Sequence, residues 1–317
     1  MITVSNRDLL ATIDESLGGE IRQVQFGGDP LLAFYEWEAP ISVTRSRTYG
    51  EAKLDWLSEY RGGWQLLVPN AGAACVVDGV PLPFHGEWSR TSVDIVYRTA
   101  TEVTMRAGTR LPFVVDRRVG VLDDPARVTV STTIENLTDR RLPFIWGEHP
   151  AFPVAPGDRI DLPSGAIIDA DDPERRATTW PKSPAADSSL DEIPPTSPFQ
   201  RVHYLPNRPA GWAALRRQNV GVGLRWELDD FPHMWLWHEI GGPGFPFFGR
   251  TSVVALEPAS SWPGDGLAAA IDNGHAQWLA AHESRSTSMT IVPFRPDGRA
   301  VVDVDEHDTI HFEGRQR

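Results

Sequence analysis

The chain has 317 residues, a formal net charge of −13 and a single cysteine, Cys75. An acidic protein repels nucleic acid and anionic membranes, so we expect neither as a partner. One cysteine cannot form an intrachain disulfide, so nothing indicates an oxidising compartment. No stretch approaches the roughly 18 apolar residues of a membrane span, and the N-terminus lacks a signal-peptide pattern. We therefore expect a cytoplasmic enzyme or binding protein, whose oligomeric state the sequence does not indicate.

Short strand patterns separated by turn residues fill the first half of the chain. Clusters of glycine and polar residues at 16–19 and 27–29 predict turns between early strands, and residues 52–60 predict a short helix or loop. The Asp78-Gly79 dipeptide predicts a tight hairpin over 75–82. Alternating apolar and β-branched runs predict further strands at 64–69, 93–98, 103–107, 113–121, 127–135 and 142–146.

The second half begins with a segment, 155–200, that is rich in Pro, Asp and Ser and has weak periodicity. We expect this segment to be a surface excursion. Strand patterns then resume at 212–215, 220–228, 234–238, 252–257 and 286–293. Together these patterns predict an all-β sandwich or barrel in one domain, 1–295, followed by a charged tail, 296–317, that is partly disordered and has a strand-like piece at 300–304.

One histidine, His149, lies within an aromatic stretch at 144–152 and precedes Pro150. A residue before proline favours an extended backbone, so His149 is expected on a buried or half-buried strand. A buried imidazole needs a hydrogen-bond partner or a chemical role. The commoner outcome is a hydrogen-bonded structural histidine, and that alternative stays open. Glu148 points to the opposite strand face, so we do not expect it to pair with His149.

A carboxylate with a similar setting is Glu257, which ends an apolar strand just before Pro258. It shares a strand face with Val253 and Ala255, and a carboxylate on an apolar face is costly unless it is paired or functional. An ordinary glutamate at a sheet rim is the alternative. We expect Glu257, His149 and His85 to converge on one pocket, where a histidine and a glutamate can act as a general acid and base.

Sequence signatures of cofactor and metal sites are missing. The chain has no nucleotide-binding loop, no dinucleotide fingerprint and no nucleophile elbow of the Gly-x-Ser-x-Gly type. It also has no zinc-binding His and Glu motif and no cysteine cluster. We therefore expect neither a cofactor nor a metal.

Several short motifs, in order, resemble the aldose 1-epimerase (galactose mutarotase-like) family over roughly residues 12–294. They are Leu67-Val68-Pro69-Asn70, His85-Gly86 with Arg90, Asn136-Leu137-Thr138, His149-Pro150-Ala151-Phe152 and Leu256-Glu257-Pro258. The resemblance implies an antiparallel β-supersandwich and an isomerase that interconverts the α and β anomers of an aldose by ring opening. It implies His149 as the general acid at the ring oxygen and Glu257 as the base at the anomeric hydroxyl. Asn70, His85 and Arg90 would bind the sugar.

The chain also departs from that family at sites that contact the sugar. Ala71 stands where an arginine often follows Pro-Asn, which argues against phosphate recognition, and Ala151 stands where an aromatic residue is usual. The aspartate that binds sugar hydroxyls has no clear match, although Asp229 and Asp230 lie near the expected region. His233 or Trp237 could take its place. The alternatives are a non-catalytic carbohydrate-binding or sensor protein on the same fold, and a lyase or hydrolase acting on a longer glycan.

Overall fold

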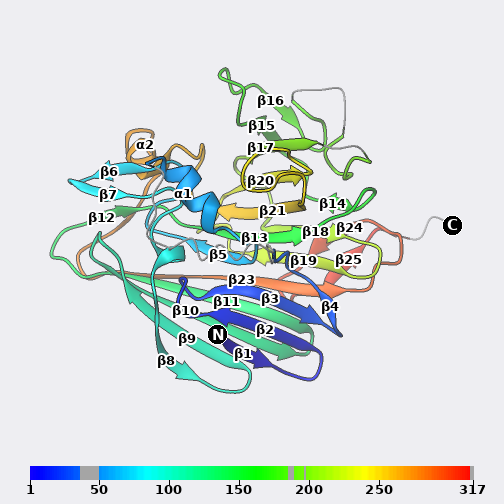
Figure 1. Ribbon diagram of the computed structural model, residues 1–317, viewed down its shortest axis with the longest axis horizontal. Helices are drawn as coiled ribbons and strands as arrows, with labels where there is room; N and C mark the ends of the chain where they lie inside the picture. Colours follow the sequence, from blue (N-terminus) through cyan, green and yellow to red (C-terminus); the bar gives the residue numbers. More distant parts are fainter. Residues whose placement is uncertain (36–49, 185–188, 196–197, 315–317) are drawn as a thin grey trace.

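The structure is a computed structural model that describes residues 1–35, 50–184, 189–195 and 198–314. Two large antiparallel sheets pack face to face, and short hairpins and helices lie around them (Figure 1). The all-β antiparallel sandwich predicted from the sequence is confirmed. Within the described residues, neither helix combines the length and the apolar character that a membrane crossing requires.

The larger sheet has 11 strands and carries the residues on which the site depends. Its order, with β4 (Asp29–Pro30) paired beside β3, is β1 (Ile2–Ser5), β2 (Leu9–Asp14), β3 (Glu20–Phe26), β5 (Trp64–Leu67), β13 (Gly147–Pro153), β21 (Ser252–Ala259), β20 (His233–Ile240), β17 (Phe199–Leu205), β15 (Ala166–Asp169) and β16 (Ala177–Thr179).

The second sheet has eight strands and covers one face of the first. Its order is β14 (Arg159–Asp161), β18 (Trp212–Arg216), β19 (Gly221–Trp226), β23 (Ser284–Phe294), β11 (Ala126–Asn136), β10 (Phe113–Asp123), β9 (Glu102–Gly108) and β8 (Asp94–Arg98). Smaller elements complete the described fold: the pairs β6 (Cys75–Val77) with β7 (Val80–Leu82), β12 (Leu142–Phe144) with β22 (Gln277–Leu279) and β24 (Val301–Val304) with β25 (Ile310–Phe312), the helices α1 (Ala52–Glu59) and α2 (Gly266–Asp272), and the 3-10 turn η1 (Trp88–Arg90).

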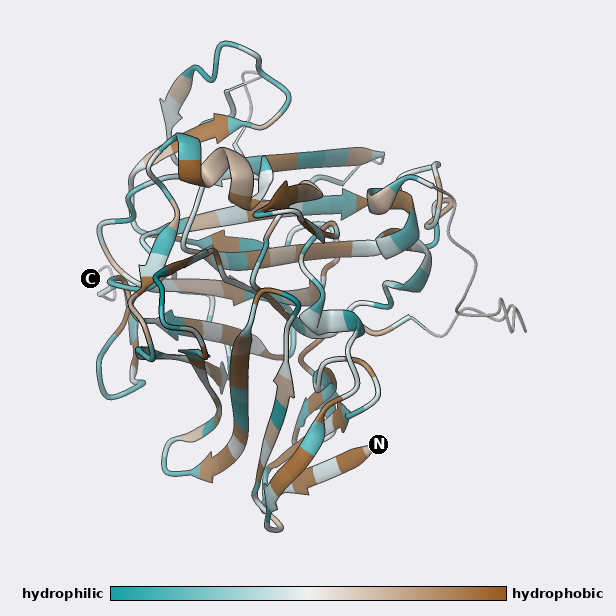
Figure 2. Ribbon diagram, turned by 90° about the vertical axis from the view of Figure 1, so that its left-hand side faces the viewer, coloured by the Kyte–Doolittle hydropathy of each residue, from teal (hydrophilic) through white to brown (hydrophobic). Residues whose placement is uncertain are grey.

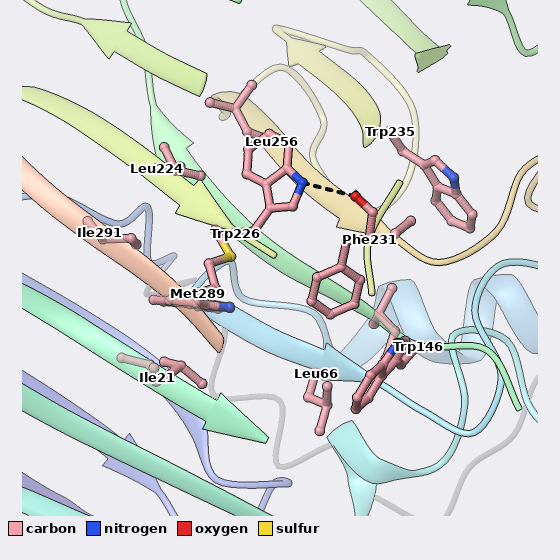
Figure 3. Close-up of a cluster of buried hydrophobic side chains, with 14 of the residues drawn as sticks. Ile21, Leu66, Trp146, Leu224, Trp226, Phe231, Trp235, Leu256, Met289 and Ile291 are labelled. Carbon is pink, nitrogen blue, oxygen red and sulfur yellow. Dashed lines mark hydrogen bonds between the residues drawn. The ribbon is translucent and has the colours of Figure 1, made fainter. Parts of the chain in front are cut away.

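The main hydrophobic core lies between the two sheets. Hydrophobic and hydrophilic residues alternate along many strands (Figure 2), as expected where one strand face is buried. Figure 3 shows Leu66 and Leu256 of the larger sheet in the same cluster as Met289 and Ile291 of the smaller one. Aromatic side chains fill the rest, and the Trp226 indole donates a 3.0 Å hydrogen bond to the carbonyl of Phe231.

Strand β13 separates this core from a second cluster on the opposite face of the larger sheet. Phe152 packs into the main core, whereas its neighbour Ala151 packs with Tyr60, Val253 and Ala255 on the other side. Successive side chains of a strand point to opposite faces. His149 therefore shares the outer face with Ala151, and Glu148 points into the core.

A buried ion pair joins the two sheets behind His149. The Arg117 guanidinium of β10 contacts both carboxylate oxygens of Glu148, at 2.8 and 2.9 Å, and the Trp64 indole donates a 2.6 Å hydrogen bond to the same carboxylate. Arg117 is 0% exposed and Glu148 is 2% exposed. Charges buried this completely are tolerated only when they are paired and hydrogen-bonded. The ion pair therefore ties β13 to the opposite sheet at one register.

Two sequence expectations need correction. The segment 155–200 contains strands β14, β15 and β16, and it buries apolar side chains such as Ile160, Ile167 and Ile193, so it belongs to the sheets rather than to a surface loop. Its positions 185–188 and 196–197 lie outside the described residues. Strand β21 also does not end before Pro258, since the strand runs to Ala259 and the proline pairs with Met234 of β20.

The charged segment after residue 295 contains more strand than the sequence predicts. The strand-like piece at 300–304 forms β24, which pairs with β25, and Val301 and Val304 pack on Trp212 and Phe294. Figure 1 shows this hairpin beside β18 and β19. The division of the chain into one domain, 1–295, and a tail stays a prediction.

The ion pair behind His149 has a measurable energy. Glu148→Leu leaves the Arg117 charge buried without its carboxylate, which should lower the free energy of unfolding by about 3–5 kcal/mol. The double variant Arg117→Met with Glu148→Leu removes both charges and should recover most of that loss. Urea unfolding of the single and double variants measures both values. A cost below about 1 kcal/mol for Glu148→Leu would show that the ion pair does not hold the sheets.

Candidate active site

A cavity of about 490 Å³ lies on the outer face of the larger sheet. Strands β13, β21, β20 and β17 supply its floor, helix α1 supplies one wall, and the turn after β7 supplies another. Its lining includes His85, His149, Trp237 and Glu257. Four of the residues predicted for the site therefore converge on one hollow, although they come from positions far apart in the chain.

His149 and Glu257 face each other across neighbouring strands at the cavity floor. Nε2 of His149 lies 3.5 Å from Oε1 of Glu257, and the two side chains are 3% and 5% exposed. The strand β21 brings Glu257 to this position because Ala255, two residues earlier, pairs with Ala151 of β13. The predicted proximity of an imidazole and a carboxylate is thus observed.

Burial shifts both groups toward their neutral forms. It lowers the pKa of His149 from the ordinary 6.5 to about 4, and it raises the pKa of Glu257 well above its ordinary value. Low-dielectric surroundings disfavour a charge on either group. Burial therefore favours a neutral imidazole beside a protonated carboxyl, and moving that shared proton lets one member act as an acid and the other as a base.

His85 is held in a fixed orientation at the edge of the cavity. Its ring Nδ1 accepts a 3.1 Å hydrogen bond from the backbone N–H of Gly72. The backbone N–H of His85 in turn donates a hydrogen bond to the carbonyl of Gly72. A neutral imidazole that accepts at Nδ1 carries its proton on Nε2. Burial, with the nearby His149 and Lys53, lowers the pKa of His85. The residue is therefore a neutral hydrogen-bond donor beside His149 and Glu257.

Aromatic rings enclose the pair on several sides. The rings of Trp56, Tyr60 and Trp237 lie with their centroids 5.6, 5.5 and 6.0 Å from that of His149. They exclude water from the two groups, which explains the depressed pKa of the imidazole. An apolar pocket with a few convergent polar groups is typical of a small-molecule site. Among the residues that the structure describes, no three His, Cys, Asp or Glu side chains group to hold a metal ion.

Asn70 does not line the cavity. Its amide donates to the carbonyls of Ala73 and Pro83, both at 2.9 Å, and its Oδ1 accepts from the N–H of Leu267 at 2.7 Å. These bonds use both donors of a side chain that is fully buried. The residue braces the loops beside His85, and the role predicted for it as a sugar ligand has no support in its contacts.

Arg90 and His233 also lie outside the cavity lining. Arg90 forms a 3.0 Å ion pair with Glu59 at the end of α1. His233 accepts a 3.0 Å hydrogen bond at Nδ1 from the N–H of Asn207. Their polar groups therefore stabilise the surrounding structure. Asp230, considered for the missing aspartate, is likewise engaged, in a 2.6 Å ion pair with Arg285.

Residues 1–292 match the protein family described as a domain of unknown function, DUF4432. The chain belongs to the DUF4432 family. A search of the curated proteins found no match.

Several solved structures have a fold similar to that of this DUF4432 chain. The Slr1438 protein from Synechocystis sp. PCC 6803 superposes with a TM-score of 0.71 at 16% identity, over 93% of this chain and 96% of that one. A candidate aldose 1-epimerase from Escherichia coli K12 gives 0.67 at 17%, over 93% and 98%. A galactose mutarotase-like protein from Lactobacillus casei ATCC 334 gives 0.66 at 16%, over 93% and 100%. The DUF4432 chain therefore has a galactose mutarotase-like fold, as the sequence motifs indicate.

The DUF4432 cavity includes residues that the sequence prediction missed. Trp235 and Glu239 line it together with Trp237. All three share one face of β20, so the period-two pattern around Trp237 contained this signal. Trp56 of α1 and Gln200 of β17 also line the cavity. No local motif marks these two, because only the packing of distant elements brings them to the site.

The buried imidazole of this DUF4432 protein should make stability depend on pH. An unfolded histidine titrates near pH 6.5, whereas the pKa of His149 is about 4, so the unfolded state binds one more proton between these values. The free energy of unfolding therefore decreases as the pH falls from about 6.5 towards 4, by about 1.4 kcal/mol per pH unit for this group. Urea unfolding at pH 7 and pH 5 should show a smaller loss for His149→Gln than for wild type. Equal losses in the two proteins would contradict the buried neutral imidazole.

Proposed function

We propose that this protein is an aldose 1-epimerase-like isomerase that interconverts the α and β anomers of a sugar. The observation that carries the proposal is the 3.5 Å approach of His149 and Glu257 at the floor of an aromatic cavity. The fold shared with a galactose mutarotase-like protein supports the same reaction, although a fold alone does not determine activity. Anomer exchange opens and closes one C–O bond with proton transfers and involves no oxidation or reduction, so it needs no redox cofactor.

The reaction requires one acid and one base on the same sugar ring. Glu257 takes the proton of the anomeric hydroxyl while His149 gives a proton to the ring oxygen. The bond from the anomeric carbon to the ring oxygen breaks, and the anomeric carbon becomes an aldehyde. Rotation about the adjacent carbon–carbon bond turns the aldehyde over. Proton transfer in the reverse directions then closes the ring as the other anomer and restores both groups.

The single proton of the pair suits this exchange. A hydroxylated ring over His149 and Glu257 offers hydrogen bonds to both, which favours the imidazolium and carboxylate forms over the neutral ones. The proton then moves from His149 to the sugar as another moves from the sugar to Glu257. His85, with its proton on Nε2, would donate a hydrogen bond to a sugar oxygen, and the ring of Trp237 would contact the bound sugar.

A carbohydrate-binding or sensor protein without catalysis would use the same cavity. Only a measurement of turnover distinguishes it from the proposed isomerase. In that case a sugar would bind and Glu257→Gln would keep the binding, but the wild type would not accelerate anomer exchange. A cytoplasmic location, expected from the sequence, stays a prediction.

Polarimetry tests the reaction directly. Wild-type protein added to a freshly dissolved pure anomer should accelerate the approach of optical rotation to equilibrium for at least one sugar in a broad panel. Because general acid–base catalysis contributes roughly 10²–10⁴-fold, His149→Gln and Glu257→Gln should each reduce the rate by at least about a hundredfold.

Matched controls are available on the surface of the same chain. His307 and Glu306 are each 80% exposed and lie outside the cavity. His307→Gln and Glu306→Gln make the same chemical changes there and should keep the wild-type rate. If the whole panel of sugars and sugar phosphates equilibrates no faster than in buffer, the isomerase proposal is rejected.

A further inference from the structure

The cavity floor continues well past the catalytic pair. On one face of β20, the residues Trp235, Trp237 and Glu239 follow one another, and all three line the cavity. Trp235 pairs with Glu257 on one side, which places it in the catalytic row of the sheet. Glu239 stands four residues further along the strand, which corresponds to about 13 Å at roughly 3.3 Å per residue.

Strand β17 runs alongside and repeats this arrangement. Tyr204 pairs with Trp235 in the catalytic row, and Gln200 pairs with Glu239 at the far end. Both Tyr204 and Gln200 line the cavity. The far end therefore carries its own polar pair, Gln200 with Glu239, on the same floor as His149 and Glu257.

One sugar ring does not span this distance. A six-membered ring with bonds of about 1.5 Å and a hydroxyl on each side measures roughly 6 Å across. A ring held over His149 and Glu257 thus leaves the Gln200–Glu239 end without a contact. The half-buried Trp237 stands between Trp235 and Glu239 along this face of β20, and Phe247 packs on its ring with centroids 5.8 Å apart. This aromatic surface suits the apolar face of a second ring.

The polar pair is built into the fold. Nε2 of Gln200 donates a 2.6 Å hydrogen bond to Oε2 of Glu239, and the N–H of Gly242 donates a 2.9 Å bond to Oε1. A Cβ at position 242 would overlap the ends of the Gln200 and Glu239 side chains, so a larger residue there would displace this pair. A carboxylate accepts about four hydrogen bonds, and the described residues supply two here. Glu239 can therefore accept bonds from hydroxyl groups.

The charges at this end favour a neutral ligand. Arg201 also lines the cavity, but its guanidinium lies 3.7 Å from Asp169 and 3.7 Å from Asp171, which compensate its charge. Glu239 itself repels anions. Lys53, a second cation of the lining, is near enough to His85 to lower the pKa of that imidazole, and so belongs to the catalytic end. A phosphate or carboxylate at the far end would thus lack a free cation among the described lining residues.

We propose that Gln200 and Glu239 form a second sugar subsite, and that the preferred ligand is a neutral reducing disaccharide or a longer glycan. The reducing-end ring lies over His149 and Glu257, and the next ring lies over Trp237 with its hydroxyls at Gln200 and Glu239. Two linked rings span roughly 12 Å, which is close to the distance of about 13 Å along β20 from the row of Glu257 to Glu239. The assignment of the reacting ring rests on the proposed isomerase function, whereas the subsite itself is a statement about binding.

Calorimetric titration of the full chain tests the subsite without requiring turnover. The probes are glucose and galactose, the reducing disaccharides maltose, cellobiose and lactose, and glucose 6-phosphate. At least one disaccharide should bind at least tenfold more tightly than either monosaccharide. Gln200→Ala and Glu239→Gln should each reduce the ratio of disaccharide to monosaccharide affinity about five- to tenfold, since each weakens hydrogen bonds to the second ring. Gln218→Ala, in the exposed turn between β18 and β19, is the matched control and should keep the preference.

The outcomes separate this inference from the proposed function. Disaccharide binding that depends on Gln200 but shows no acceleration in polarimetry would support the subsite and reject the isomerase. Rapid anomer exchange of monosaccharides, with no disaccharide bound more tightly, would overturn the subsite and keep the isomerase. Equal weakening of monosaccharide and disaccharide binding by Gln200→Ala, or tighter binding of glucose 6-phosphate than of any disaccharide, would also overturn it.

Discussion

The alternation of side chains along β13 is the constraint on which the rest of the structure depends. Glu148 turns into the core and is held by Arg117 and Trp64, so its neighbour His149 must turn outward. A shift of the β13 register by one residue would turn the imidazole into the core and leave the Arg117 charge unpaired. The ion pair therefore determines, from the far side of the sheet, which face of β13 meets Glu257.

The same packing gives the two catalytic candidates their chemical character. The rings of Trp56, Tyr60 and Trp237 surround His149, and the resulting exclusion of water makes both charged forms costly. An exposed imidazole and carboxylate at this distance would form an ordinary ion pair at neutral pH. Here burial leaves one proton for two groups, which is the state that a reversible exchange of protons with a sugar needs.

Local patterns in the sequence account for much of the fold and for part of the site. Period two identifies the long strands β10 and β11, and the apolar face that ends at Glu257 identifies the floor of the cavity. Asn70 could not be assigned in this way, because its Oδ1 accepts from the N–H of Leu267, 197 positions further along the chain. A polar residue next to a motif serves either the ligand or the scaffold, and only the distant partners decide which. The strands within 155–200 were missed for a similar reason, since they are short and are stabilised by the sheets that they extend.

The most direct test of this account is a crystal structure of the Glu257→Gln variant with a reducing sugar bound. The account predicts that the ring oxygen lies within hydrogen-bond distance of the imidazole of His149, and that the anomeric hydroxyl lies within the same distance of residue 257. The anomeric carbon must then sit between the two strands β13 and β21. A sugar that binds elsewhere on the protein, or that turns its anomeric carbon away from both side chains, would contradict the account.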